Sequence, residues 1–199
     1  MKIKYCIFDI GNVCYPYSFV QLNNRVRELV SDKEAFDKAG GLGSFDFDPL
    51  LKGEVSFTQF CKDLCAQYHI PYQKQIEIVL NAADHACLGS FFEVTKQLMS
   101  ELRAQGIEIG LLSNITPDLE DIVPDIVDKD KCFLSYEMGL IKPDPEIYKL
   151  VIQKLKAQPQ EILFIDDKPQ NIEAAQELGI NGIVFNKDTI VQEVQKFLS

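Results

Sequence analysis

The sequence lacks an uninterrupted apolar run of about 18 residues, the length that a helix needs to span a membrane. It also lacks an excess of basic residues: 20 Lys and Arg stand against 30 Asp and Glu, so the formal net charge is −10. Proteins bind nucleic acids through clustered Lys and Arg, and a negative net charge also repels small anions. We therefore expect neither a membrane nor a nucleic-acid partner, and any phosphorylated ligand needs a local cation.

Long leader-like segments are also missing, because Asp9 interrupts the short apolar run near the amino terminus. We therefore expect no secretory signal and a cytoplasmic location. The six cysteines are irregularly spaced, which favours reduced thiols over a disulfide framework. Cys61 and Cys65 lie four residues apart, but no second Cys or His pair accompanies them, so no zinc site is predicted.

Apolar content is ample, with 46% hydrophobic residues in a chain of 199. That length fits one large domain or one domain carrying an insertion. Short β-prone runs alternate with helical patterns along most of the chain, which predicts an α/β fold with a Rossmann-like, mostly parallel sheet flanked by helices. The predicted strands cover residues 3–8, 107–112, 132–134, 162–165 and 183–185.

The segment between the first two predicted strands is helical and too long for a single crossover connection. Ser31 with Glu34, and Ser56 with Gln59, have the spacing of capping boxes at helix starts. We interpret this segment as a small helical cap inserted after the first strand. The predicted division is a core of residues 1–16 and 87–199 and a cap of residues 17–86.

Polar residues stand at the carboxyl ends of three predicted strands, and a lysine follows in a later loop. Each of them alone is more often a turn, a cap or a solvated residue. Together they predict a ligand site, because the carboxyl ends of parallel strands share one edge of the sheet. Carboxylates with one cation suit a phosphate and a divalent metal bound together. The residues are Asp9, Ser113 and Asn114, Lys142, and Asp166 and Asp167.

Four segments in this order resemble the motifs of the haloacid dehalogenase superfamily, with the helical segment at the position of the family's C1-type cap. Within the superfamily the chain is most similar to bacterial glucose-1-phosphate phosphatases and to the amino-terminal phosphatase domain of soluble epoxide hydrolase. The motifs lie at residues 8–13, 111–114, 142–148 and 164–175.

The resemblance implies a Mg²⁺-dependent phosphatase acting on a small phosphorylated metabolite, with a sugar phosphate as a candidate. Asp9 is the implied nucleophile, which forms an aspartyl-phosphate. Mg²⁺ is expected to bind Asp9, the backbone carbonyl of Gly11 and Asp167, all hard oxygen ligands. Asp166 is expected to orient a metal-bound water or Lys142 from outside the ligand set.

The phosphoryl group has its own implied ligands. Ser113 and the backbone amide of Asn114 are expected to bind its oxygens. Lys142 is expected to neutralise charge on the phosphoryl group and on Asp9, so that a carboxylate can approach a phosphate dianion.

Gly11 departs from the pattern of most phosphatases of this family, which carry an acid/base Asp two residues after the nucleophile. Such a group is worth about 10²–10⁴ in rate. Either the substrate has a good leaving group, such as an anomeric sugar phosphate, or a cap residue donates the proton. The candidate donors, which the sequence does not rank, are Asp46, Asp48, Tyr15 and His85.

Two alternatives remain open at the level of the sequence. One is a metal-free 2-haloacid dehalogenase of the same superfamily, against which Gly11 counts, since those enzymes usually carry Tyr there. The other is a weakly active or non-catalytic protein that binds a phosphorylated metabolite. The sequence predicts neither the physiological substrate nor the oligomeric state.

Overall fold

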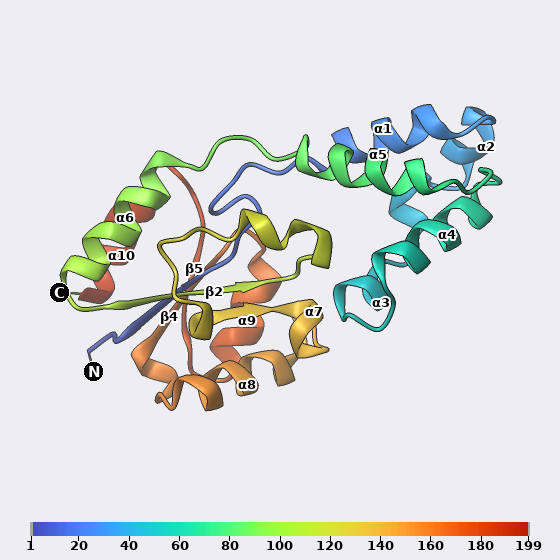
Figure 1. Ribbon diagram of the computed structural model, residues 1–199. Coiled ribbons are helices and arrows are strands. Elements are labelled where there is room, and N and C mark those ends of the chain that lie inside the picture. The colour runs from blue at the N-terminus through green and yellow to red at the C-terminus, as the bar shows by residue number, and fades with distance from the viewer. Residues whose placement is uncertain (1, 199) are drawn as a thin grey trace.

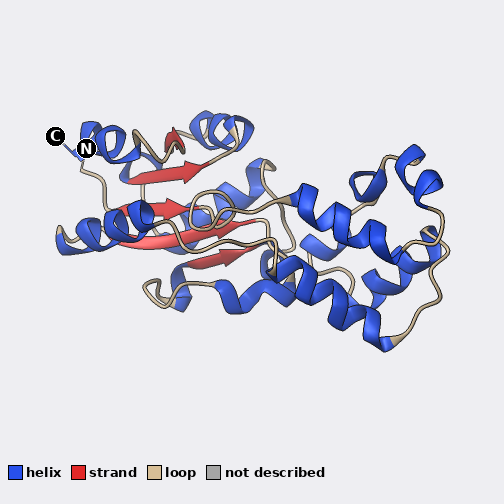
Figure 2. Ribbon diagram, turned by 90° about the horizontal axis from the view of Figure 1, so that it is seen from above, coloured by secondary structure: helices blue, strands red, loops and turns tan. Residues whose placement is uncertain are grey.

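The computed structural model describes residues 2–198 and contains a five-stranded parallel sheet in the order β3-β2-β1-β4-β5. Helices cover both faces of the sheet (Figures 1 and 2). The fold class predicted from the alternating pattern is therefore confirmed. The strands are β1 (Tyr5–Phe8), β2 (Glu108–Ser113), β3 (Cys132–Leu134), β4 (Ile162–Asp166) and β5 (Asn181–Val184).

Successive side chains of a strand point to opposite faces, and the central strand β1 shows the consequence. Cys6 and Phe8 join the apolar core under α6 (Glu93–Ala104) and α10 (Ile190–Leu198). Ile7 joins the core on the other face, under α8 (Pro145–Leu155) and α9 (Pro169–Glu177). Both faces of the sheet are thus buried, as parallel sheets require.

Five helices between β1 and α6 form a separate lobe at the upper right of Figure 1, with an apolar core of its own. Ser56 caps α4 as predicted, accepting a hydrogen bond from the backbone of Gln59. The predicted cap at Ser31 is wrong: the helix begins later, and Asp32 caps it instead. The helices are α1 (Phe19–Leu29), α2 (Lys33–Lys38), α3 (Asp48–Leu51), α4 (Phe57–Gln67) and α5 (Lys74–His85).

The two chain segments that join the lobe to the sheet run side by side. Tyr17 and Leu88 form an antiparallel bridge, and backbone hydrogen bonds of 3.2 Å and 2.9 Å join Ser18 to Cys87 and Gly89 to Pro16. These contacts lie at the boundaries predicted for the cap, although the division into two domains stays a prediction. Among residues 2–198 no helix has the length and apolar character needed to cross a membrane.

Short helices complete the connections between the longer elements. The segment after β2 forms the 3₁₀ helix η2 (Pro117–Ile122), which begins after Thr116 without a capping hydrogen bond from that side chain. Asp144 caps α8, accepting a hydrogen bond from the backbone N–H of Glu146. The remaining short helices are η1 (Gly41–Ser44) in the lobe, η3 (Lys129–Lys131) before β3, α7 (Ser135–Met138) after β3 and η4 (Pro159–Glu161) before β4.

Candidate active site

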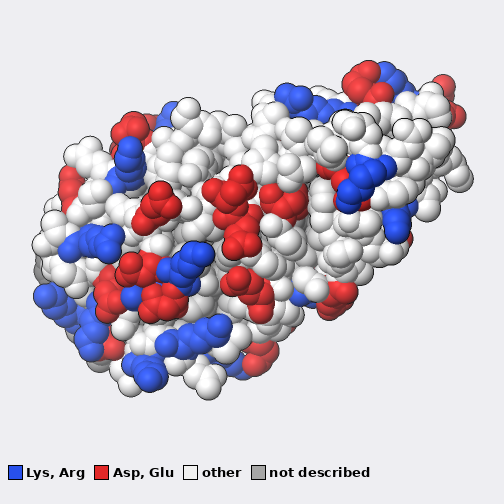
Figure 3. All heavy atoms as spheres, viewed as in Figure 1, with Lys and Arg blue, Asp and Glu red and all other residues white. Residues whose placement is uncertain are grey.

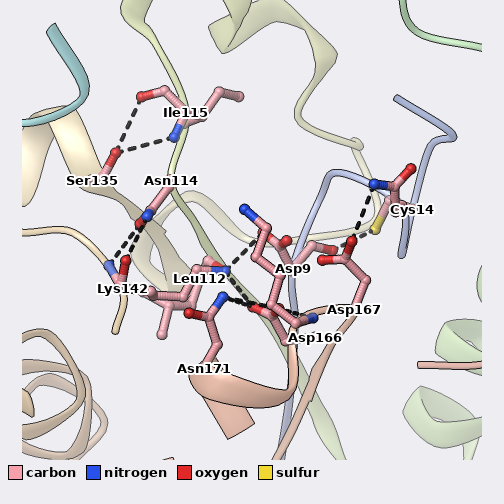
Figure 4. Close-up of polar contacts among 12 residues, drawn as sticks. Asp9, Cys14, Leu112, Asn114, Ile115, Ser135, Lys142, Asp166, Asp167 and Asn171 are labelled. Carbon is pink, nitrogen blue, oxygen red and sulfur yellow. Dashed lines mark hydrogen bonds and ion pairs between the residues drawn. The ribbon is translucent and has the colours of Figure 1, made fainter. Parts of the chain in front are cut away.

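The predicted site residues at the strand ends meet at one edge of the sheet (Figure 4). β1 lies between β2 and β4, so Asp9 directly after β1 is flanked by Ser113 and Asp166, the last residues of those strands. The backbone N–H of Asp9 donates to the carbonyl of Ile165 at 2.9 Å, which extends the ladder to the nucleophile candidate. The position of Asp9 therefore follows from strand pairing.

Lys142 reaches this edge from the loop between α7 and α8, and its side chain is only 2% exposed. Its ammonium group forms ion pairs with Asp9 Oδ1 at 2.9 Å and Asp166 Oδ2 at 2.6 Å, and donates to the carbonyl of Leu112 at 2.8 Å. Burial lowers the pKa of Lys142, but the charges of Asp9 and Asp166 outweigh it, and the pKa is raised above its usual value. The two carboxylates therefore favour the charged form of Lys142.

Both oxygens of Asp166 are occupied by donors from the protein. Oδ1 accepts from the backbone N–H of Lys168 at 2.8 Å, and Asn171 Nδ2 lies 3.0 Å from Oδ1 and 2.9 Å from Oδ2. The Lys142 ion pair also uses Oδ2, and the residue is fully buried. These contacts favour an orienting role for Asp166 over direct binding of a ligand.

Asp167 is more open than its neighbour and completes a group of carboxylates. One oxygen from each of Asp9, Asp166 and Asp167 lies within 4.8 Å of the others, the kind of arrangement that holds a metal ion. Burial raises the pKa of Asp167, and the charges of Asp9 and Asp166 add to the effect, against an opposing hydrogen bond of 3.1 Å from Asn12. A cation at this place relieves that repulsion.

Asn114 has a contact that sequence reasoning missed. Its side chain donates to the carbonyl of Lys142 at 2.9 Å and accepts from the backbone N–H of Lys142 at 2.8 Å. The expectation for Asn114 concerned its backbone amide alone. The amide side chain holds the Lys142 loop against the end of β2, and no local signal pairs two residues 28 positions apart.

Ser135, at the start of α7, holds the same region from the other side. Its hydroxyl accepts a hydrogen bond from the backbone N–H of Ile115 at 3.1 Å and donates one to the carbonyl of Ile115 at 3.2 Å. Ser113, two residues before Ile115, is buried at the end of β2. The side chain of Ser135, directly after β3, thus holds the loop that follows β2.

Gly11 does not need to be a glycine for backbone reasons. Its φ lies outside the left-handed region, and a Cβ built on it meets only Tyr17 Cβ, at 4.0 Å. The surroundings therefore leave room for a Cβ at this position.

A cavity of about 320 Å³ lies between the helical lobe and the strand ends, and Gly11, Ser113 and Asn114 form part of its wall. Most of the lining is apolar and comes from both sides of the boundary. Polar groups enter it from Tyr17, Asp84, Thr116 and Lys168 among others. The apolar lining residues are Ile10, Phe19, Leu22, Phe47, Leu51, Leu88, Ile115, Leu119 and Ile122.

The four proton-donor candidates named from the sequence lie elsewhere. His85 pairs with Asp121 at 2.9 Å, and Tyr15 packs edge-on against Phe91. Asp46 and Asp48 are exposed in the lobe. Within residues 2–198 none of the four lines the cavity, whereas Asp84 does.

Comparison with known proteins gives a family match over nearly the whole chain. Residues 3–179 match the family described as haloacid dehalogenase-like hydrolase. A D-ribitol-5-phosphate phosphatase from Bacteroides thetaiotaomicron is 29% identical, covering 89% of this chain and 89% of that protein. Bifunctional epoxide hydrolase 2 from Sus scrofa is 41% identical over 98% of this chain. The chain spans only 39% of that protein, and 19% of acyl-CoA dehydrogenase family member 10 from Mus musculus.

Solved structures share the fold across both lobes. A HAD-like family hydrolase from Porphyromonas gingivalis has a TM-score of 0.82 at 23% identity, with 100% of both chains covered. A HAD family enzyme from Bacteroides thetaiotaomicron in complex with magnesium and inorganic phosphate has a TM-score of 0.75 at 23% identity. That comparison covers 93% of this chain and 95% of the other.

Proposed function

This chain belongs to the haloacid dehalogenase-like hydrolase family, and we propose that within it the protein is a Mg²⁺-dependent phosphatase of a small phosphorylated metabolite. The observation that carries the proposal is the buried Lys142, ion-paired with Asp9 and Asp166 beside Asp167. The similarity to a D-ribitol-5-phosphate phosphatase supports the reaction class.

The charges of the site fit a divalent cation. Three carboxylates and one lysine leave an excess of two negative charges, which repels a phosphate dianion. A divalent ion cancels that excess, and carboxylate and carbonyl oxygens are the ligands that Mg²⁺ prefers. Asp9, the carbonyl of Gly11 and Asp167 are the proposed ligands, because Asp166 is already occupied by protein donors. When bound, the ion supplies positive charge against the phosphoryl oxygens.

Asp9 is the proposed nucleophile, oriented by the ion pair of its Oδ1 with Lys142. A carboxylate oxygen of Asp9 forms a bond to phosphorus, and the bond from phosphorus to the leaving alcohol breaks. Ser113 and the backbone N–H of Asn114 bind the phosphoryl oxygens during the transfer. Water then hydrolyses the aspartyl-phosphate, so that the products are the free alcohol and inorganic phosphate.

Removal of divalent metal tests the proposal. The protein is incubated with a panel of sugar phosphates and other phosphate monoesters, and released phosphate is measured with Mg²⁺ and with EDTA. We expect hydrolysis with Mg²⁺ and its loss in EDTA, with recovery when excess Mg²⁺ is added. Hydrolysis that continues unchanged in EDTA contradicts the metal requirement.

The alternatives kept from the sequence give different results in the same experiment. Halide release from 2-haloacids in the presence of EDTA supports a metal-free dehalogenase. Binding of phosphate monoesters without any turnover supports a non-catalytic binding protein. The proposal expects neither outcome, and the group of Asp9, Asp166 and Asp167, which could hold a metal ion, supports it over a metal-free reaction.

Replacement of Gly11 by Asp is expected to raise the rate with poor leaving groups by about 10²-fold, the lower range for general acid–base help. A Cβ at this position meets only Tyr17 Cβ, at 4.0 Å, so the backbone site accepts a side chain without a clash at its first atom. The effect is measured as kcat for alkyl phosphates relative to 4-nitrophenyl phosphate, whose leaving group needs no proton. Gly11→Asn is the matched control, and an equal rate in both variants contradicts the expectation.

A further inference from the structure

One part of the cavity wall is acidic. Tyr17 donates a hydrogen bond of 2.8 Å to Asp84 Oδ1, which places this carboxyl of α5 against the wall. Asp84 and Thr116 line both the main cavity and a chamber of about 30 Å³, which Asp118 of η2 also lines. The other residues that line the chamber are apolar side chains of the lobe, and its volume exceeds the roughly 10–15 Å³ that one water molecule needs.

The carboxylates in this part of the wall have no cation of their own. Within residues 2–198 neither Asp84 nor Asp118 forms an ion pair with Lys or Arg, and His85 pairs with Asp121 instead. Burial raises the pKa of Asp84 to about 6, with Tyr17 opposing and Asp118 adding to the shift. Burial also raises the pKa of Asp118. His85 lies close enough to oppose the raised pKa of both carboxyls, but no Lys or Arg of residues 2–198 pairs with either of them.

One carboxylate oxygen in this part of the wall has no well-placed donor. Asp118 Oδ1 is buried without a hydrogen-bond partner in the described chain. Thr116 is 9% exposed, and its hydroxyl lies beside the Asp118 carboxyl without a hydrogen bond of good geometry. The side-chain amide of Asn81 donates to the other carboxylate oxygen of Asp118, Oδ2, at 3.5 Å. Buried polar atoms are rarely left unpaired, so this arrangement points to a ligand that brings donors.

The rest of the cavity wall is mostly apolar. Phe19, Leu22 and Phe47 come from the lobe, and Leu119 and Ile122 come from η2. Lys168, next to Asp167 in the sequence, also lines the cavity. Acidic side chains also cover the surface over the segment after β2, where Glu120, Asp121 and Asp125 lie (Figure 3). These acidic side chains disfavour a second anionic group on the substrate. The apolar wall residues can contact a carbon chain.

We propose that the substrates of this phosphatase are phosphorylated amino alcohols, whose ammonium group binds between Asp84, Asp118 and Thr116 while the phosphate lies at Asp9. This inference rests on the proposed phosphatase function and names the substrate class of the same cavity.

An ammonium group fits better than a hydroxyl for two reasons. It has three N–H donors and no acceptor, which matches three acceptor side chains. It also cancels charge, and a nearby opposite charge favours the ionised form of a buried carboxyl. A hydroxyl donates one hydrogen bond and leaves the repulsion between Asp84 and Asp118 in place. Charge-assisted hydrogen bonds are roughly twice as strong as neutral ones.

Matched substrates test the inference. Three series of phosphate monoesters, with chains of two to six carbons, end in an ammonium, a hydroxyl or a methyl group at the far end. We expect the aminoalkyl phosphate of the best length to exceed the alkyl phosphate of equal length by about ten-fold or more in kcat/KM, the effect of one charge-assisted hydrogen bond. The hydroxyalkyl phosphates are expected to fall between the two.

Variants connect that preference to the residues. Asp84→Asn and Asp118→Asn are expected to lower the aminoalkyl-to-alkyl ratio toward one. Asp130→Asn removes an exposed carboxyl of the same charge and is expected to leave the ratio as it is. Both cavity variants keep the size of the side chain, and thermal unfolding verifies that they are folded.

The outcomes separate this inference from the proposed function. Equal or slower hydrolysis of the aminoalkyl series at every length overturns the substrate class while leaving a phosphatase. Equal rates for hydroxyl and ammonium show that charge plays no part and also overturn it. A preference that survives both cavity variants overturns the assigned residues. Absence of hydrolysis for every monoester overturns the phosphatase itself.

Discussion

Replacing Asp9 with Asn is expected to reduce phosphate monoester hydrolysis by more than about 10³-fold, because the amide is not a nucleophile and no other carboxylate can take its place. Asp166 is held by Lys142, Asn171 and the backbone of Lys168. Asp167 lies after the strand end, where it bonds to Asn12. The measurement is kcat/KM for the best monoester of the panel with saturating Mg²⁺.

The Asn side chain has nearly the shape of the Asp that it replaces, so the fold is expected to survive. Asp63→Asn, an exposed change of the same kind in α4, is the control for preparation and charge. Thermal unfolding of both variants distinguishes a lost nucleophile from a lost fold. Activity that persists in folded Asp9→Asn shows that Asp9 is not the nucleophile and contradicts the mechanism.

Replacing Lys142 with Met is expected to reduce both stability and activity. The change leaves Asp9 and Asp166 facing each other in a buried site without the cation that joins them. Removing one partner of a buried ion pair typically costs about 3–5 kcal/mol. For a chain of this length that corresponds to a Tm lower by roughly 6–20 °C. The measurement is thermal unfolding at neutral pH.

Activity is expected to fall together with stability, by at least about 10²-fold at a temperature where the variant is still folded. The reason is that the carboxylates then repel the incoming phosphate without the lysine to offset them. Lys149→Met, in which an exposed lysine on α8 is changed, is the control and is expected to behave like the unchanged protein. A Tm that falls no further in Lys142→Met than in this control contradicts the role given to the ion pairs.

Local pattern was enough to place the strands and the residues that follow them. The apolar runs at 132–134 and 162–165 coincide with β3 and almost with β4, and a parallel sheet brings their carboxyl ends to one edge. The place of Asp9 after β1 follows from its neighbours in sequence, whereas its assignment to a site depended on the other strand-end residues as well. Helix boundaries were harder to predict where two neighbouring residues can both act as the N-cap. At the start of α2 the cap is Asp32, one residue after the predicted Ser31.

The sequence by itself therefore determined the sheet, the family motifs and the carboxylates at the strand ends, since each depends on residues close together in the chain. Tertiary structure alone decided which side chains hold Lys142 and which line the cavity. Asn114 contacts Lys142 across 28 positions, and Tyr17 contacts Asp84 across 67. Such pairs form only when separate segments pack, and no local periodicity records the packing of one segment on another.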